Sequence, residues 1–281
     1  MVNIGYHAAK IQGNFLRSIY KSSLSSLVSF PIAQERQVPL KVYALSCERD
    51  LPEQVASLRS FLRHVGIPKV FTIMSDGSYT EESIQLLRLV HPCVDVQLLT
   101  KFQRDDLPQS VYEYASQQAM GKKLAALMSI PIDEATLYTD SDILFFQGAS
   151  DLADLATSGD LDTYYLPDCK NSLDKRLIYE DIEQQDPINA GFILFKKALN
   201  WDESVQRLTN LQESGNYFSE QTIVNLTIKH NHGKALAHEK YIMNVDDQFS
   251  YPDKFATKQI AMRHYVSDIR HKFWQSVFFK P

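Results

Sequence analysis

The chain has 281 residues, 44% of them hydrophobic, so it can bury one large core or two modest ones. Its net charge is −5 and its pI is about 5.9, which gives no electrostatic reason to expect nucleic acid as a partner. The three cysteines, Cys47, Cys93 and Cys169, are far apart, which argues against zinc and disulfide frameworks and suits a reducing cytoplasm. Because no apolar run reaches the roughly 18 residues of a membrane span and no signal-peptide pattern is present, we expect a cytoplasmic protein.

The first segment with helical periodicity covers residues 7–30. Hydrophobic residues recur there at helical spacing with basic residues between them. The hydrophobic residues are Ile11, Phe15, Ile19, Tyr20, Leu24, Leu27 and Val28, and the basic residues are Lys10, Arg17 and Lys21. We expect a helical extension over residues 1–38 that packs on the body of the protein or on a second copy. Peripheral contact with a membrane surface is the alternative.

After Pro39 short apolar strands alternate with amphipathic helices, a pattern that predicts an α/β fold with a parallel, doubly wound sheet. Asp50 is the expected N-cap of the first helix, and Gly66 ends it. The expected elements are strands at 41–46, 70–74 and 94–99, with helices at 50–66 and 80–90 between them.

A long helix at 110–129 is expected to lead into an apolar strand that ends at Asp140. Beyond it the pattern becomes mixed, which predicts a mixed central sheet. The later elements expected are strands at 163–166, 188–195, 234–237 and 260–265, and helices at 199–212 and 220–230. We assign residues 39–281 to one domain whose second half closes the site.

The clearest chemical signal is the pair Asp140 and Asp142, which lies between that apolar strand and a second one at residues 143–146. In extended backbone, residues two apart point the same way, so both carboxylates can face one spot at the edge of the sheet. A hard divalent cation, Mg²⁺ or Mn²⁺, would relieve their repulsion and keep coordination positions for phosphate oxygens. Asp160 and Asp162 repeat the spacing after a turn signal, and we interpret that copy as a solvated loop.

Four further segments, in this order along the chain, resemble the signature of GT-A nucleotide-sugar glycosyltransferases. The resemblance is strongest to the retaining family eight, which includes glycogenin and bacterial lipopolysaccharide galactosyltransferases. The segments are Gly121-Lys122-Lys123-Leu124, Ile188-Asn189-Ala190-Gly191, Phe218-Ser219-Glu220-Gln221, and His264-Tyr265 followed by Lys272-Phe273-Trp274.

The resemblance implies that Asp140, Asp142 and His264 bind Mn²⁺ and that Asp140 also contacts the donor. It implies that Lys272 holds the diphosphate of a UDP-sugar, although the interval from His264 to Lys272 is about two residues longer than in the family. Lys123 would be the basic residue that precedes the aspartate strand.

Asn189, Glu220 and Gln221 are the catalytic candidates that the resemblance implies. Asn189 opens an apolar strand, where a buried amide needs polar partners such as sugar hydroxyls. An amide is a poor base, so Gln221 beneath the reacting carbon favours transfer with retention. Ser219 is expected to cap the helix that carries Glu220 and Gln221.

Asp76 lies in Met74-Ser75-Asp76-Gly77-Ser78, which looks like the D-D-G-S turn of inverting GT-A enzymes. That likeness makes Asp76 a candidate for contact with the base or ribose. The alternative is a structural turn residue ahead of the next helix.

The function expected is metal-dependent transfer of a hexose from a UDP-sugar to a hydroxyl of a carbohydrate, lipid or protein acceptor, with retention. Two alternatives stay open. One is an inverting enzyme with Glu220 as the base. The other is a non-catalytic subunit that keeps the GT-A fold for nucleotide-sugar binding or as a scaffold.

Overall fold

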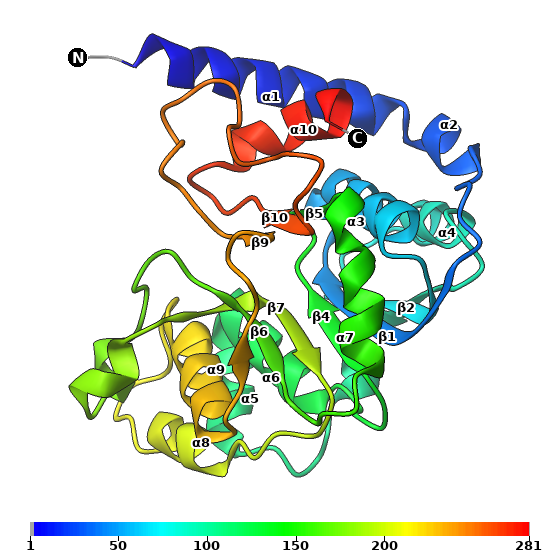
Figure 1. Cartoon of the computed structure of the whole chain (residues 1–281). Helices are drawn as coiled ribbons and strands as arrows, with labels where there is room; N and C mark the ends of the chain where they lie inside the picture. Colours follow the sequence, from blue (N-terminus) through cyan, green and yellow to red (C-terminus); the bar gives the residue numbers. More distant parts are fainter. Residues whose placement is uncertain (1–2, 281) are drawn as a thin grey trace.

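The computed structural model describes residues 3–280, and Figure 1 shows how the elements are arranged around a central sheet. The sheet has seven strands in the order β3-β2-β1-β4-β7-β6-β8. Their bounds are β1 Gln37–Ser46, β2 Ile67–Ser75, β3 Val94–Leu98, β4 Thr136–Thr139, β6 Tyr164–Pro167, β7 Ile188–Phe195 and β8 Lys234–Ala235.

Strands β3, β2, β1 and β4 are mutually parallel, which confirms the doubly wound first half. β7 runs antiparallel to β4 and to β6, so the sheet is mixed, as expected. Because of this reversal, the start of β7 lies at the same edge of the sheet as the ends of β1, β2, β4 and β6. The ends of the mutually parallel strands and the start of β7 therefore meet at one edge.

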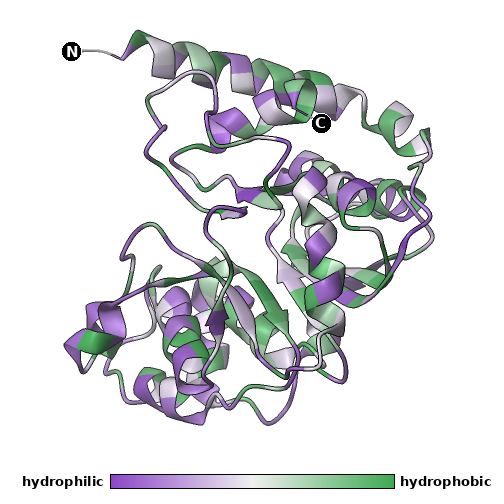
Figure 2. Cartoon of the chain, in the orientation of Figure 1, coloured by the Kyte–Doolittle hydropathy of each residue, from purple (hydrophilic) through white to green (hydrophobic). Residues whose placement is uncertain are grey.

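Successive side chains of a strand point to opposite faces of the sheet, so the buried strands contribute to a hydrophobic core on each face. Val42 and Ala44 of β1 pack in the cluster that includes α3 (Leu51–His64) and α4 (Glu81–Leu89). Tyr43, between them in sequence, packs in the cluster that includes α6 (Ala119–Ser129) and α9 (Ser219–His230). In Figure 2 the strands of the sheet are accordingly coloured mostly as hydrophobic.

A small second sheet lies beside the central one, in the order β5-β10-β9. Its strands are β5 (Ile143–Phe145), β10 (Met262–His264) and β9 (Tyr241–Ile242). His264 pairs with Ile143 in the antiparallel ladder of β10 and β5. This pairing brings a residue near the end of the chain beside the segment that follows β4.

The N-terminal residues form the helices α1 (Ile4–Ser22) and α2 (Leu24–Ser29). α1 lies along α10 (Phe273–Phe279) on the outside of the molecule (Figure 1). Gly13 sits against the backbone of His271, where a Cβ would come within 2.3 Å of a carbonyl oxygen. The first helix thus packs on the body of the protein, and none of the described helices is long and apolar enough to cross a bilayer.

The long helix expected at 110–129 is wrong, because the chain breaks at Gln118 into α5 (Gln109–Gln117) and α6. Gln118 is extended, with φ −141° and ψ 145°. Gly121 lies so close to the backbone of Tyr114 that a Cβ there would come within 2.3 Å of it. The two helices therefore cross in contact, which one continuous helix could not do.

Several other expected elements are shorter than predicted or were missed. The helix expected at 199–212 is α8, Asp202–Thr209, and the strands expected at 234–237 and 260–265 shrink to β8 and β10. The helices α7 (Asp151–Thr157) and α10 and the strand β9 were not expected.

The residues that begin the helices differ in how they cap them. Thr80 caps α4, since its side chain accepts from the Ser83 N–H. Asp50 is the N-cap residue of α3 as expected, but its carboxylate accepts from Arg49 rather than from the helix backbone. Ser219 lies inside α9, and its hydroxyl donates to Asp174 at 2.6 Å.

Candidate active site

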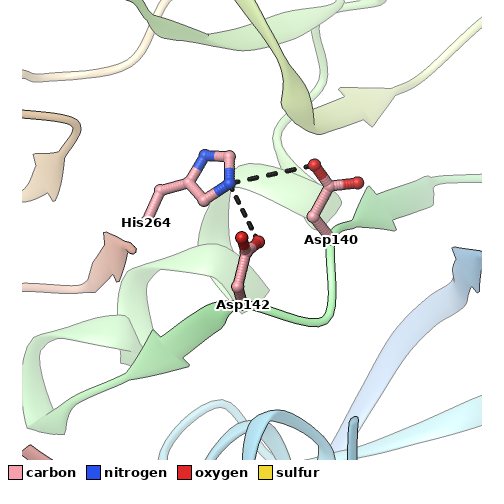
Figure 3. A group of neighbouring side chains, drawn as sticks. All are labelled: Asp140, Asp142 and His264. Atoms are coloured by element: carbon pink, nitrogen blue, oxygen red, sulfur yellow. Dashed lines mark hydrogen bonds and ion pairs between the residues drawn. The ribbon is translucent and has the colours of Figure 1, made fainter. Parts of the chain in front are cut away.

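Two aspartates and a histidine meet at the edge of the sheet where β4 ends (Figure 3). Asp140 and Asp142 follow β4, and His264 is the last residue of β10. One ligand atom from each of the three lies within 4.8 Å of the others. His264 Nε2 is 3.0 Å from Asp142 Oδ1 and 3.8 Å from Asp140 Oδ2. The predicted metal ligands are therefore together.

The orientation of the His264 ring is fixed by Asn189. The Asn189 Oδ1 accepts the Gly191 N–H at 2.9 Å, and its Nδ2 donates to Asp168, so the amide can be oriented in only one way. Nδ1 of His264 lies 3.0 Å from the same Oδ1 and must therefore donate to it. This leaves Nε2 directed at the carboxylates, in the arrangement usual for a histidine that binds a metal.

Gly191 gives these side chains the room they occupy. A Cβ at this position would lie 2.4 Å from His264 Cε1 and 2.7 Å from Asp140 Oδ2. The glycine of the N-A-G segment is thus required by the close approach of β7 to both groups.

Asp140 is held by a buried lysine and a buried tyrosine. Lys123 Nζ on α6 donates to Asp140 Oδ2 at 2.9 Å, and the Tyr138 hydroxyl donates to Oδ1 at 2.9 Å. Burial lowers the pKa of Lys123, but the attraction of Asp140 and Glu220 outweighs burial and raises it above its usual value. Lys123 is therefore a fixed positive charge beside the first aspartate.

Asp142 pairs with Arg270 as well as with His264. Arg270 Nη2 donates to Asp142 Oδ2 at 2.9 Å. Burial raises the pKa of Asp142, but His264 and then Arg270 outweigh it and hold the pKa well below its usual range. Asp142 is thus ionised, and each of the two aspartates has one basic side chain as a partner.

The structure does not bring Lys272 to this site. Its side chain is fully buried and its Nζ donates to Asp247 Oδ2 at 2.7 Å. Arg263 Nη2 donates to the same carboxylate at 3.0 Å, and Arg263 Nε lies 2.8 Å from Asp253. Lys272 belongs to this buried network of charges, and Arg270 is the cation of the C-terminal segment that reaches the aspartates.

Asn189 and Gln221 are linked through Asp168, which the sequence analysis did not single out. Asp168 Oδ2 accepts from Asn189 Nδ2 at 3.0 Å and from Gln221 Nε2 at 3.1 Å. Asp168 follows β6 directly and is half-buried. The three side chains form a polar group beside the metal ligands.

Glu220 faces away from this polar group, toward Lys123. Its side chain is 3% exposed, and its Oε1 is 3.7 Å from Lys123 Nζ with no hydrogen-bond partner among residues 3–280. Burial raises the pKa of Glu220 to about 6, because the opposing attraction of Lys123 is smaller. Glu220 therefore lies beside Lys123, whereas Gln221 contacts Asp168.

Asp76 lies at the same edge of the sheet, after β2, and is exposed. Its Oδ1 accepts from the N–H and the hydroxyl of Ser78, which fixes the turn. The second D-x-D copy is in a loop, as interpreted, but it is paired rather than free. Lys196 lies 3.0 Å from Asp160, and Lys234 pairs with Asp162.

Arg270 and Asp168 carried signals that could have identified them. The interval from His264 to Lys272 is two residues too long for the family, and the shorter interval ends at Arg270, which is also basic. Asp168 is a carboxylate directly after an apolar strand, the same context that distinguished Asp140.

No protein-family model matches this chain, and no curated protein is similar to it in sequence. Solved structures with a similar fold include the galactosyltransferase LgtC with donor and acceptor sugar analogues (TM-score 0.53, 12% identity, 85% of this chain and 95% of that chain). Mouse xyloside xylosyltransferase 1 is similar over 84% of this chain and 99% of its own, with a TM-score of 0.55 and 13% identity.

The glycosyltransferase GlyE of Streptococcus pneumoniae TIGR4 is similar over 87% of this chain and 61% of its own (TM-score 0.53, 15% identity). At these identities the likeness establishes the fold alone. The chain has the GT-A glycosyltransferase fold, as the resemblance implied.

Proposed function

We propose that this protein transfers a hexose from a UDP-sugar to an acceptor hydroxyl, with a divalent cation and with retention of configuration. The observation that carries the proposal is the group of Asp140, Asp142 and His264 at the carboxyl edge of a GT-A sheet. LgtC, one of the similar structures, was solved with donor and acceptor sugar analogues.

The donor set fits Mn²⁺ or Mg²⁺. Two carboxylates and one imidazole nitrogen already point at one another, and the Asn189 hydrogen bond keeps His264 in the tautomer that offers Nε2. A divalent cation, when bound there, supplies positive charge to the two phosphates of the donor and to the leaving group.

Lys123 and Arg270 provide the fixed charge around this site. In the structure each neutralises one aspartate, so the local charge of the four groups is balanced. With a divalent cation on the aspartates, the same two side chains would leave an excess of positive charge. We expect this excess to attract the diphosphate, with Arg270 in the role that the sequence assigned to Lys272.

Asp168, Asn189 and Gln221 are the groups that we assign to the donor sugar. Asp168 can accept hydrogen bonds from sugar hydroxyls, and the two amides that hold it fix its direction. Gln221 is half-buried and therefore accessible, whereas Glu220 is 3% exposed and faces Lys123. A base for the acceptor hydroxyl must touch that hydroxyl, so this geometry favours Gln221 and retention over inversion by Glu220.

The direct test is a panel of α-linked UDP-hexoses with Mn²⁺, in which UDP release is measured and the first product is followed by NMR. Mn²⁺-dependent release and an α-linked product are expected. A β-linked product would reject retention and move the catalytic role to Glu220. Donor binding by calorimetry with no release, alone or with acceptor sugars, would identify a non-catalytic binding subunit instead.

A further inference from the structure

The outermost helix, α1, presents hydrophobic side chains to solvent. Ile4, Ile11 and Phe15 are 79%, 71% and 65% exposed, and Ile19 is 38% exposed. At about 100° per residue these four positions fall within about 80° of one another on the helix, so they form a single stripe. We call these four residues the outer stripe.

The outer stripe is not the face that packs on the protein. The packing face consists of Ala9, Gly13, Leu16 and Tyr20, all buried. It contacts α10 and the turn at Arg270–Lys272. α1 is therefore hydrophobic on two sides, of which one is buried inside the molecule and the other is exposed to solvent.

The charge of this segment is opposite to that of the rest of the chain. Residues 1–34 contain Lys10, Arg17 and Lys21 but no Asp or Glu, a net charge of +3. The remaining residues therefore carry −8. The protein is acidic as a whole, yet its outermost helix is basic.

The basic side chains lie along one flank of the outer stripe. At about 100° per residue, Lys10 and Lys21 fall about 20° apart, about 130° from the middle of the stripe and about 90° from its nearer edge at Ile11. Both are exposed, and neither forms an ion pair with another residue of the part that the structure describes. Arg17, on the same flank, is held by Glu53 at 2.6 Å.

Further unpaired cations lie beneath this helix, on α3. Arg59 and Arg63 line a cavity of about 170 Å³ that Tyr20 and Leu27 close from the side of α1 and α2. Within residues 3–280 neither arginine pairs with a carboxylate, and Arg59 donates only to the carbonyl of Phe30. The positive field of α1 is thus reinforced from below.

We propose that α1 docks this protein on an anionic membrane surface, with the outer stripe in the headgroup region and Lys10 and Lys21 on the acidic headgroups. A helix with an exposed apolar stripe beside a basic flank is the form that binds in the plane of such a surface. A second copy of the chain fits less well, because pairing two α1 helices face to face would bring like charges together.

The test is flotation of the full chain with phosphatidylcholine vesicles that contain or lack 30% phosphatidylglycerol, at low and high salt. We expect binding only to the anionic vesicles, and loss of most binding at high salt. Lys10→Gln with Lys21→Gln should weaken binding about 30-fold at low salt, since each surface lysine contributes a factor of about five. Ile11→Ser with Phe15→Ser should weaken it at least about tenfold.

Matched controls test whether the effect is specific to α1 or follows from the loss of any exposed hydrophobic or basic residue. Leu161→Ser removes a residue that is 64% exposed outside α1, and Lys175→Gln with Lys197→Gln removes two exposed lysines elsewhere. These variants should bind as the unchanged protein does. Equal binding to neutral vesicles, or equal losses in the controls, would overturn the proposal. So would a dimer, detected by light scattering, that the Ile11→Ser and Phe15→Ser variant converts to monomer.

Discussion

Glu220→Gln should stabilise the cation-free protein at pH 8 and should have almost no effect at pH 4.5. In the folded protein, burial raises the pKa of Glu220 from its ordinary 4.5 to about 6. The folded state therefore holds this proton more tightly than the unfolded state does. The stability linked to the proton is full below about pH 4.5 and is lost as the pH rises through about 6.

The magnitude follows from the size of this shift. A difference of about 1.5 pKa units corresponds to about 2 kcal/mol in the free energy of unfolding. Glutamine resembles the protonated acid, so the variant avoids this cost at pH 8. With an unfolding entropy of about 2.1 cal/mol/K per residue, a chain of this length should gain about 3 °C in Tm.

The assay is urea and thermal unfolding followed by circular dichroism, at both pH values and with a chelator present. Glu183→Gln is the matched control, because burial raises the pKa of Glu183 but Arg207 outweighs burial and lowers the pKa to about 2. It should therefore lose about 2 kcal/mol of stability at pH 8, after allowance for solvent screening. If Glu220→Gln destabilised the protein equally at both pH values, the ionised Lys123–Glu220 pair would be stabilising and our reasoning would be refuted.

Three further predictions concern the residues of the site and the buried network beside it. Asp142→Asn should abolish Mn²⁺-dependent binding of UDP in calorimetry, whereas Asp160→Asn should leave this binding unchanged. If both variants bound UDP with the same affinity, the metal site would be misassigned. Arg270→Ala should weaken binding of UDP with Mn²⁺ by about 1.5–3 kcal/mol with little change in Tm. Lys272→Met should instead lower the free energy of unfolding by about 3 kcal/mol, because it leaves the buried Asp247 carboxylate with one partner fewer. Asn189→Ala should weaken Mn²⁺ binding roughly 10–100-fold by freeing the imidazole, and unchanged metal affinity would show that the ring needs no such support.

The first half of the fold could be predicted because its signals are local. The strands β1, β2 and β3 and the helices α3 and α4 follow from apolar runs and amphipathic periods, and they lie where the sequence places them. The strand β9, and the short lengths of β5 and β10, could not be predicted in the same way. Each has two or three residues and exists only because of pairing with a segment far away in sequence.

The site shows the same division. Asp140 and Asp142 could be identified from the sequence because two carboxylates at the end of an apolar strand repel each other unless a cation or a basic group pairs with them. The assignment of the phosphate-binding cation to Lys272 relied on order along the chain, and order does not reveal that Asp247 and Arg263 draw Lys272 into a buried network. Which of two nearby cations faces the aspartates is decided by tertiary packing, and Arg270 is the one that does.

The distribution of the ligands along the chain also governs when the site can form. Asp140 and Asp142 are synthesised long before His264 and Arg270, and the segment that carries the later pair is held in place by α1, which precedes the sheet in the sequence. A nascent chain can therefore build the parallel half of the sheet but cannot bring these four residues together until α1 has docked on the segment around α10. On the function we propose, a bound cation would stabilise only the assembled fold, so metal supply would act on the last step of folding rather than on the early steps.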